Sequence, residues 1–145
     1  MPSTTFTVRT SLTPTQTMAV LTDFGPDRAK LWANIDEAHF RVHELGPTWA
    51  EVTEGNSIGW ERERYEWDDH AGTLTIETLD SNIWRPGSGW RYQLSPRDGG
   101  TEITVTLTRV AKAFVGILLG AAIPLVGGRT LSKQLRSVLA KAEAR

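Results

Sequence analysis

The feature that most constrains the fold is AFVGILLGAAIPLVGG at residues 113–128, a run of sixteen residues without a charge. As a helix, this run would be apolar on every side, and such a helix must be enclosed by other parts of the protein. In a chain of this size a curved sheet can enclose it. The next segment, residues 129–145, predicts an amphipathic helix, because apolar residues recur at helical spacing with charges between them. Those residues are Leu131, Leu135, Val138, Leu139 and Ala142.

A membrane-spanning helix is the main alternative for residues 113–128. Such a helix needs about 20 apolar residues, whereas this run is shorter and contains Pro124. We therefore expect a buried helix and no integral membrane span. Gly116 and Gly120 match the small-xxx-small spacing of packed membrane helices, but that spacing equally lets a strand approach closely. Pro124 crowds the carbonyl of Gly120, so we expect a kink or break at residues 124–128.

Length and composition exclude several classes of protein. The 145 residues fit one domain, residues 1–145, with a sizeable core. Sixteen basic and seventeen acidic residues give a net charge of −1 without a basic block, which argues against a nucleic-acid partner. The absence of cysteine excludes disulfides, thiolate nucleophiles and the common zinc sites. The opening MPSTTFTVRTSL lacks the pattern of a signal peptide, so we expect a cytoplasmic protein.

Hydrophobic periodicity and turn residues predict an α+β chain. A strand at residues 5–12 precedes Thr13 and Pro14, which predict the N-cap and first position of a helix ending near Gly25. A second short helix is anchored by Leu31 and Trp32. Together with the final helix, this order predicts a curved seven-stranded antiparallel sheet around the C-terminal helix. The six further strands are expected at residues 38–45, 49–54, 58–67, 73–79, 89–94 and 102–110.

The order of these elements matches the helix-grip fold. The segments GPTWAEVTEGNSIGWERERYEWDDHAGTLTIETLDSN and GWRYQLSPRDGGTEITVTLTR resemble the SRPBCC superfamily, in particular its polyketide cyclase/dehydrase and lipid-transport (START-like, Bet v 1-like) branch. This resemblance implies a cavity for a hydrophobic ligand between the sheet and the last helix. Most such proteins are binders, and a minority are cyclases, aromatases or hydrolases. The chain departs from the pattern at Pro124 and Gly127-Gly128, where relatives continue the helix.

No motif for a metal, a cofactor or a catalytic triad stands out. His39 and His43 are four residues apart, but alternation with Phe40 and Val42 favours a strand. On a strand such residues lie about 13 Å from one another, too far to share a metal. The chain contains no dinucleotide fingerprint and no Gly-rich phosphate loop in the required strand–helix context. We therefore predict neither a cofactor nor a metal site.

The predicted strand at residues 58–67 carries charge on both faces. One face holds Trp60, Arg62, Arg64 and Glu66, and the other holds Glu61, Glu63, Tyr65 and Trp67. Whichever face is buried must pair its charges. One interpretation is an exposed ladder of ions; the other turns Trp60 inward and lets Arg62 or Arg64 bind an acidic ligand group, since an arginine fork suits a carboxylate or phosphate.

These patterns predict that the protein binds a lipid-like or polycyclic aromatic molecule. Two alternatives remain: a cyclase or aromatase whose acid or base would be Glu61, Glu63, Glu66 or Tyr65, and a peripheral membrane contact through residues 114–126. We expect a monomer or a homodimer. The candidate ligand-binding residues are Trp60, Arg62, Arg64, Trp84, Trp90, Tyr92, Phe114 and Leu118.

Overall fold

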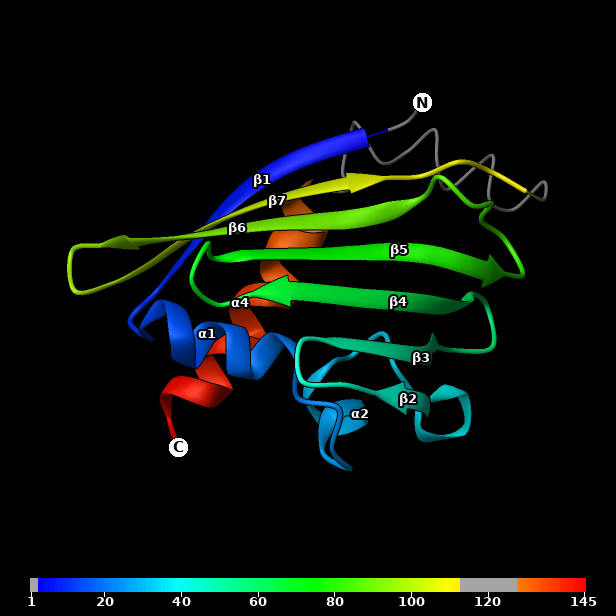
Figure 1. Cartoon of the computed structure of the whole chain (residues 1–145), viewed down its shortest axis with the longest axis horizontal. Helices are drawn as coiled ribbons and strands as arrows, with labels where there is room; N and C mark the ends of the chain where they lie inside the picture. Colours follow the sequence, from blue (N-terminus) through cyan, green and yellow to red (C-terminus); the bar gives the residue numbers. More distant parts are fainter. Residues whose placement is uncertain (1–2, 113–127) are drawn as a thin grey trace.

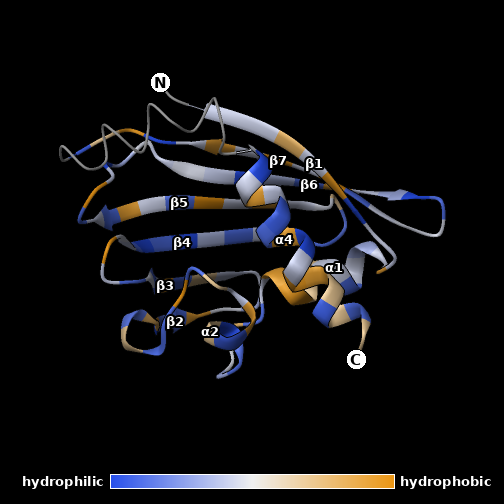
Figure 2. Cartoon of the chain, turned by 180° about the vertical axis from the view of Figure 1, so that it is seen from behind, coloured by the Kyte–Doolittle hydropathy of each residue, from blue (hydrophilic) through white to orange (hydrophobic). Residues whose placement is uncertain are grey.

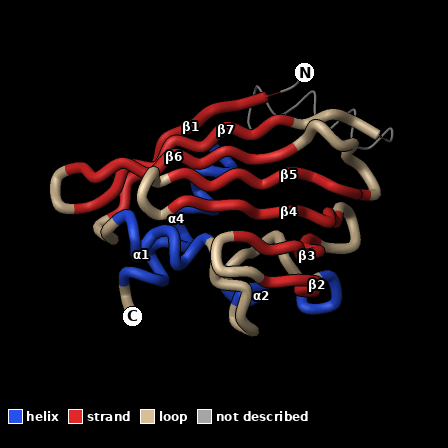
Figure 3. Tube along the Cα trace, viewed as in Figure 1, coloured by secondary structure: helices blue, strands red, loops and turns tan. Residues whose placement is uncertain are grey.

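A curved antiparallel sheet dominates the computed structural model, which describes residues 3–112 and 128–145 (Figure 1). In these residues the sheet has seven strands in the order β1-β7-β6-β5-β4-β3-β2, so that every consecutive pair from β2 to β7 is a hairpin (Figure 3). This arrangement confirms the predicted α+β helix-grip architecture. The strands are β1 (Ser3–Thr10), β2 (Arg41–Leu45), β3 (Trp49–Gly55), β4 (Trp60–Asp68), β5 (Thr73–Ser81), β6 (Gly89–Arg97) and β7 (Gly100–Thr108).

Two short helices, α1 (Pro14–Leu21) and α2 (Arg28–Leu31), lie between β1 and β2, as the sequence predicted. A capping box fixes the start of α1. The backbone amide of Gln16 donates to the Thr13 hydroxyl at 3.1 Å, and the side-chain oxygen of Gln16 accepts from the backbone amide of Thr13 at 2.9 Å. These two bonds satisfy backbone donors that the first turn of a helix leaves unpaired. The helix packs its apolar side against the sheet, because Met18 and Leu21 are buried in the core.

The amphipathic helix α4 (Gly128–Glu143) lies across one face of the sheet and packs against β1 (Figures 1 and 2). Its buried stripe includes Leu135, Val138 and Leu139, which confirms the predicted periodicity. Glu143 fixes the end of the helix by accepting hydrogen bonds from the Thr10 hydroxyl at 2.6 Å and the Ser11 amide at 3.1 Å. The predictions for the apolar run, including the kink at residues 124–128 and the membrane contact, lie outside the described residues.

The segment before β2 differs from the predicted strand at residues 38–45. A 3₁₀ turn, η1 (Glu37–His39), comes first, because the Asp36 carboxylate accepts from the His39 amide at 2.9 Å and caps the turn. His39 therefore lies in a different element from His43, whose ring is hydrogen-bonded to the Thr53 hydroxyl at 2.7 Å.

The inner face of the sheet, which faces α4, contains the core. Alternate residues of β6 and β7 are buried there, as their periodicity predicted. They are Tyr92, Leu94, Ile103, Val105 and Leu107. Within residues 3–112 and 128–145, no helix combines the length and apolar character needed to cross a bilayer.

Candidate functional site

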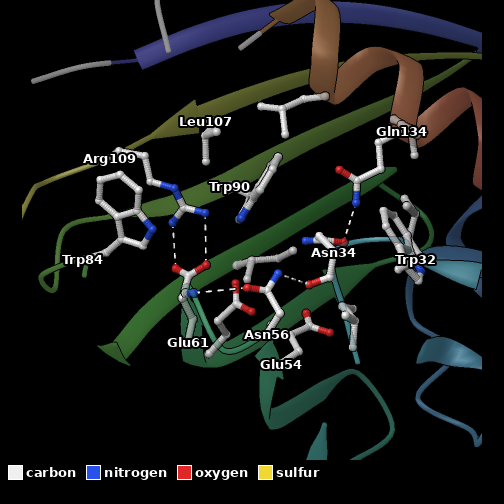
Figure 4. A pocket seen from close by; sticks show the side chains of 18 of the residues that line it. Trp32, Asn34, Glu54, Asn56, Glu61, Trp84, Trp90, Leu107, Arg109 and Gln134 are labelled. Atoms are coloured by element: carbon white, nitrogen blue, oxygen red, sulfur yellow. Dashed lines mark hydrogen bonds and ion pairs between the residues drawn. The ribbon is translucent and has the colours of Figure 1, made fainter. Parts of the chain in front are cut away.

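A cavity of about 440 Å³ lies between the inner face of the sheet and α4 (Figure 4). Much of its wall is apolar or aromatic, and both the strands and α4 contribute to that wall. Trp90 and Tyr92 stack with ring centroids 6.3 Å apart, which gives the cavity a flat aromatic surface. The apolar and aromatic residues that line the cavity include Trp32, Leu74, Ile76, Ile83, Trp84, Trp90, Tyr92, Leu107, Leu131 and Leu135.

The polar wall of the cavity comes from the β3–β4 hairpin. Its register places Glu54 directly opposite Glu61, and Glu63 follows two residues later on the same face of β4. The ribbon of β4 is accordingly hydrophilic along most of its length (Figure 2). All three carboxyl groups line the cavity. Buried carboxylates require compensation by cations or protons, and two arginines from distant parts of the chain supply the cations.

Arg28, at the start of α2, neutralises Glu54. Its guanidinium is buried and donates to Glu54 Oε2 at 2.8 Å and to the Tyr65 hydroxyl at 2.9 Å. It also donates to the backbone carbonyls of Leu21 at 3.2 Å and Asp23 at 2.9 Å. The Tyr65 hydroxyl in turn donates to Glu54. Burial by itself raises the pKa of Glu54, but the charge of Arg28 and these hydrogen bonds outweigh it and lower the pKa. Glu54 is therefore ionised at neutral pH.

Arg109, directly after β7, neutralises Glu61. It donates to the two carboxylate oxygens at 2.7 and 3.0 Å, a bidentate pair that Figure 4 shows at the cavity wall. Its guanidinium also lies over the rings of Trp84 and Trp90, 5.0 and 5.4 Å from their centroids. The Thr78 hydroxyl adds a hydrogen bond to Glu61 at 2.8 Å. Fork geometry and ring stacking are contacts that lysine would not reproduce.

A β-bulge in β5 supports this part of the site. The register between β4 and β5 shifts at Arg62/Glu63, because β5 has one more residue than β4 at this point. An extra residue in a strand redirects the side chains that follow it. As a result both Thr78 and Ser81 are buried. The Ser81 hydroxyl accepts from the amides of Ile83 and Trp84, each at 3.1 Å, and so holds these two residues in the cavity wall.

Glu63 is the third carboxyl group, and no arginine is hydrogen-bonded to it among the described residues. It is only 3% exposed. Burial raises its pKa well above the ordinary value of 4.5, and the charges of Glu61 and Glu54 raise it further against the lowering effect of Arg109. Burial and its two carboxylate neighbours therefore favour the protonated form of Glu63, whereas Glu54 and Glu61 are each paired with an arginine.

Three polar side chains connect the elements around the opening of the cavity. The Gln134 amide of α4 donates to Asn34 Oδ1, and the Asn56 amide donates to the Asn34 carbonyl at 3.0 Å (Figure 4). Beside them Ile58 is 70% exposed although it lines the cavity. These hydrogen bonds and the exposed Ile58 together place the entrance to the cavity between α4 and the β3–β4 turn.

The structure brings only part of the predicted ligand-binding set into the cavity. Trp84, Trp90 and Tyr92 line it. Arg62 and Arg64, by contrast, pair with Glu51 at 3.5 and 3.2 Å and are partly exposed. The side chains of Trp60, Arg62 and Arg64 belong to the outer face of β4, because the three alternate with Glu61, Glu63 and Tyr65, which line the cavity. Phe114 and Leu118 lie outside the described residues.

The inward orientation of Trp60 was therefore the wrong alternative. Arg62 and Arg64 belong to the exposed ladder of ions, which was the other interpretation. The buried, paired charges are on the opposite face of β4. Of the four acid or base candidates of the enzyme hypothesis, Glu61, Glu63 and Tyr65 line the cavity. Glu66 does not, because it is exposed and pairs with Arg64 at 2.7 Å. Arg28 and Arg109 were missed, because neither lies in a local motif. The signal that could have found them is the charged composition of both faces of residues 60–67, which requires cations from elsewhere if one face is buried.

No cluster of three or more histidine, aspartate or glutamate side chains in the described residues is arranged to hold a metal ion. Of the three cavity glutamates, Glu54 forms an ion pair with Arg28 and Glu61 forms one with Arg109.

Comparison with solved structures gives matches over almost the whole chain. A protein from Thermus thermophilus is 14% identical and has a TM-score of 0.80, with 99% of this chain and 98% of that chain covered. The Zhui aromatase/cyclase from a Streptomyces species is 16% identical with a TM-score of 0.78, over 99% and 94% of the two chains. A START superfamily protein from Mycobacterium smegmatis is 13% identical with a TM-score of 0.76, over 98% and 97%.

These likenesses confirm, at the level of the fold, the resemblance drawn from the sequence. Neither family models nor curated protein sequences give a match to the chain. Identities this low establish a shared fold, and function has to be argued from the site itself.

Proposed function

We propose that this protein binds a small, largely apolar molecule in the cavity between the sheet and α4. The observation that carries this proposal is the cavity itself, whose aromatic wall of Trp84, Trp90 and Tyr92 faces Leu131 and Leu135 of α4. Its volume of about 440 Å³ falls within the range of about 300–1,000 Å³ typical of small-molecule pockets, which are mostly apolar with a few oriented polar groups. The Streptomyces aromatase/cyclase, which has the same fold, is consistent with a polycyclic aromatic ligand.

A thermal-shift screen of fatty acids, sterols and polycyclic aromatics tests the proposal. A ligand at a hundredfold excess over its Kd stabilises the native state by about 2.7 kcal/mol. For a domain of this size the melting temperature should rise by about 5–11 °C. Tryptophan emission should change as well, because three tryptophans line the cavity. If none of the three ligand classes raises the melting temperature, the proposal fails.

A matched pair of variants separates cavity binding from surface binding. Leu131 lines the cavity on α4, so Leu131→Trp should fill part of it and weaken any ligand that binds there. Leu45 lies on the edge strand β2 and is 63% exposed, so Leu45→Trp adds the same side chain away from the cavity. Equal effects of the two substitutions would show that the ligand binds elsewhere.

Glu63 favours a second candidate function, a reaction of the cyclase or aromatase type. Such reactions move protons between carbon and oxygen, and a cavity carboxyl group whose pKa is raised by burial is suited to give a proton to a ligand oxygen. Positioned general acids contribute about 10²–10⁴-fold to a rate. In this scheme Glu63 gives its proton to the ligand oxygen, and water or one of the two carboxyl groups paired with Arg28 and Arg109 takes the proton from carbon.

Deuterium exchange tests this second function. The methyl protons of 2-acetylnaphthalene exchange in D₂O through its enol, and NMR measures the rate. The protein should accelerate this exchange, and Glu63→Gln, which retains the shape of the acid, should slow it by about 100-fold or more. The variant should still be stabilised by the ketone. Exchange at the same rate in both proteins would exclude Glu63 as the acid.

A further inference from the structure

The charges of the cavity are balanced within the protein. The positive charge of Arg28 is compensated by Glu54, and that of Arg109 by the bidentate pair with Glu61. The donors of Arg28 are moreover all occupied, because Nε, Nη1 and Nη2 bind Glu54, the Tyr65 hydroxyl and two backbone carbonyls. Among the described cavity residues, therefore, neither arginine offers an uncompensated positive charge to an anionic ligand.

The remaining carboxyl group, Glu63, makes the cavity unfavourable for a further negative charge. It is buried beside Glu54 and Glu61, and burial and these two charges raise its pKa because a third negative charge there is unfavourable. A ligand carboxylate would add the same third charge after losing its own hydration. A desolvated charge without a partner is among the most costly groups to bury.

Tyr92 supplies a hydrogen-bond donor that no other described residue uses. Its side chain is buried and lines the cavity, and its hydroxyl has no hydrogen-bond partner among residues 3–112 and 128–145. Burial raises the pKa of Tyr92, with Glu63 and Glu54 adding to the effect and Arg28 and Arg109 opposing it, so the hydroxyl keeps its proton. Tyr92 lines the same cavity as Glu54 and Glu63. No buried side-chain nitrogen or oxygen of the described residues lacks a hydrogen-bond partner, so the Tyr92 hydroxyl is open to the cavity, where a ligand acceptor can take its hydrogen bond.

From these three observations we propose that the cavity selects an uncharged ligand whose carbonyl or hydroxyl oxygen accepts a hydrogen bond from Tyr92, and that it rejects carboxylate ligands. This inference rests on the proposed function and specifies its ligand class. It reverses the expectation that an arginine binds an acidic head group, because the two arginines at the cavity are compensated by Glu54 and Glu61. Fatty acids and other anions are therefore poor ligands, and aromatic ketones and phenols are good ones.

Three probes with one ring system test the selection by isothermal titration calorimetry at pH 7. They are 2-acetylnaphthalene, which is neutral with an oxygen acceptor, 2-ethylnaphthalene, which has no acceptor, and 2-naphthoate, which is anionic. The ketone should bind at least tenfold more tightly than the naphthoate, a difference of about 1.4 kcal/mol. Naphthoate binding as tightly as the ketone would overturn the inference while leaving the proposed function intact. Failure of all three probes to bind would also overturn the inference, and the thermal-shift screen would then decide the proposed function.

Two variants assign the selection to named residues. Tyr92→Phe removes only the hydroxyl, so the ratio of ketone to 2-ethylnaphthalene affinity should fall by about threefold to tenfold, the contribution of one hydrogen bond. An unchanged ratio would exclude Tyr92 as the donor. Glu61→Gln leaves the positive charge of Arg109 uncompensated, so naphthoate should gain at least tenfold in affinity over its binding to the wild type. A Glu61→Gln protein that folds but still rejects naphthoate would refute the charge argument. If that variant does not fold, the wild-type and Tyr92→Phe titrations decide the question.

Discussion

Both faces of the β3–β4 hairpin carry glutamates that pair with arginines, but in two different environments. On the outer face, Arg62 and Arg64 pair with Glu51, and Arg62 has a side chain that is 44% exposed. On the inner face, glutamates of the same two strands pair with Arg28 and Arg109 and are screened from water by α2, α4 and the aromatic wall. The outward set is Glu51, Arg62, Arg64 and Glu66, and the inward set is Glu54, Glu61, Glu63 and Tyr65.

This difference shows that burial determines how much an ion pair contributes to stability. Exposed pairs contribute about 0–1 kcal/mol, because water and salt compete with them. Inside the cavity each charge has lost its hydration, so removing one partner leaves the other uncompensated. The same desolvation raises the pKa of Glu63 and so favours its protonated form. Glu54 is also buried, but its partner Arg28 lowers its pKa and keeps it ionised.

The largest expected effect comes from removing a cation on the inner face. Arg28→Ala leaves the buried Glu54 without its partner and should lower the free energy of unfolding by about 3–5 kcal/mol. The control on the outer face, Arg62→Ala, should lower it by no more than about 1 kcal/mol. Urea unfolding at pH 7 measures both changes. Equal losses in the two variants would show that the inner pair is not desolvated in solution.

The next effect is a dependence of stability on pH that Glu63 alone should produce. Its folded-state pKa is raised above the ordinary value of 4.5, so its favourable contribution is complete below pH 4.5 and is lost as pH rises through the folded-state pKa. Over that window wild-type stability should fall relative to Glu63→Gln by up to about 1.4 kcal/mol per pH unit. Urea titrations at several pH values from 5 to 9 measure this difference.

Glu54 acts with the opposite sign and serves as an internal control. Its pKa is lowered from 4.5, so its contribution is present above pH 4.5 and is lost as pH falls through the lowered pKa. Wild type and Glu63→Gln should share this acid-side loss, so it should cancel in their difference. A difference between the two proteins that does not change with pH would contradict the raised pKa of Glu63.

The smallest effect is the sensitivity of the outer face to salt. Glu51→Gln removes the shared partner of Arg62 and Arg64. The loss of stability should be no more than about 1 kcal/mol, and it should fade in 1 M NaCl, where the screening length is about 3 Å. The loss in Arg28→Ala should persist at the same salt concentration. An Arg28→Ala loss that also disappears in salt would place both pairs in the same environment.

The fold could be predicted because its signals are local. Thr13 and Pro14 mark the start of a helix wherever they occur before a suitable apolar run. Alternation along β6 and β7 identifies Tyr92 and Val105 as inward-facing without any knowledge of their neighbours. The stripe of α4 likewise follows from spacing alone. Steric and hydrogen-bonding rules over a few residues determine each of these features.

The polar residues of the site depend on contacts between distant parts of the chain, which patterns of neighbouring residues do not reveal. Both faces of β4 mix charges with aromatic rings, so hydrophobic alternation does not tell which face is inward. The inward face is the one whose glutamates can pair with arginines from distant parts of the chain. These are Arg28, 26 residues before Glu54, and Arg109, 48 residues after Glu61. A buried carboxylate is stable only beside a cation or a proton, and the topology of the sheet determines where those cations lie. By itself the sequence determined the helices, the strands and the apolar wall. The tertiary structure decided which face of β4 is inward, which arginine pairs with Glu54 and which with Glu61, and why burial beside those two carboxylates raises the pKa of Glu63.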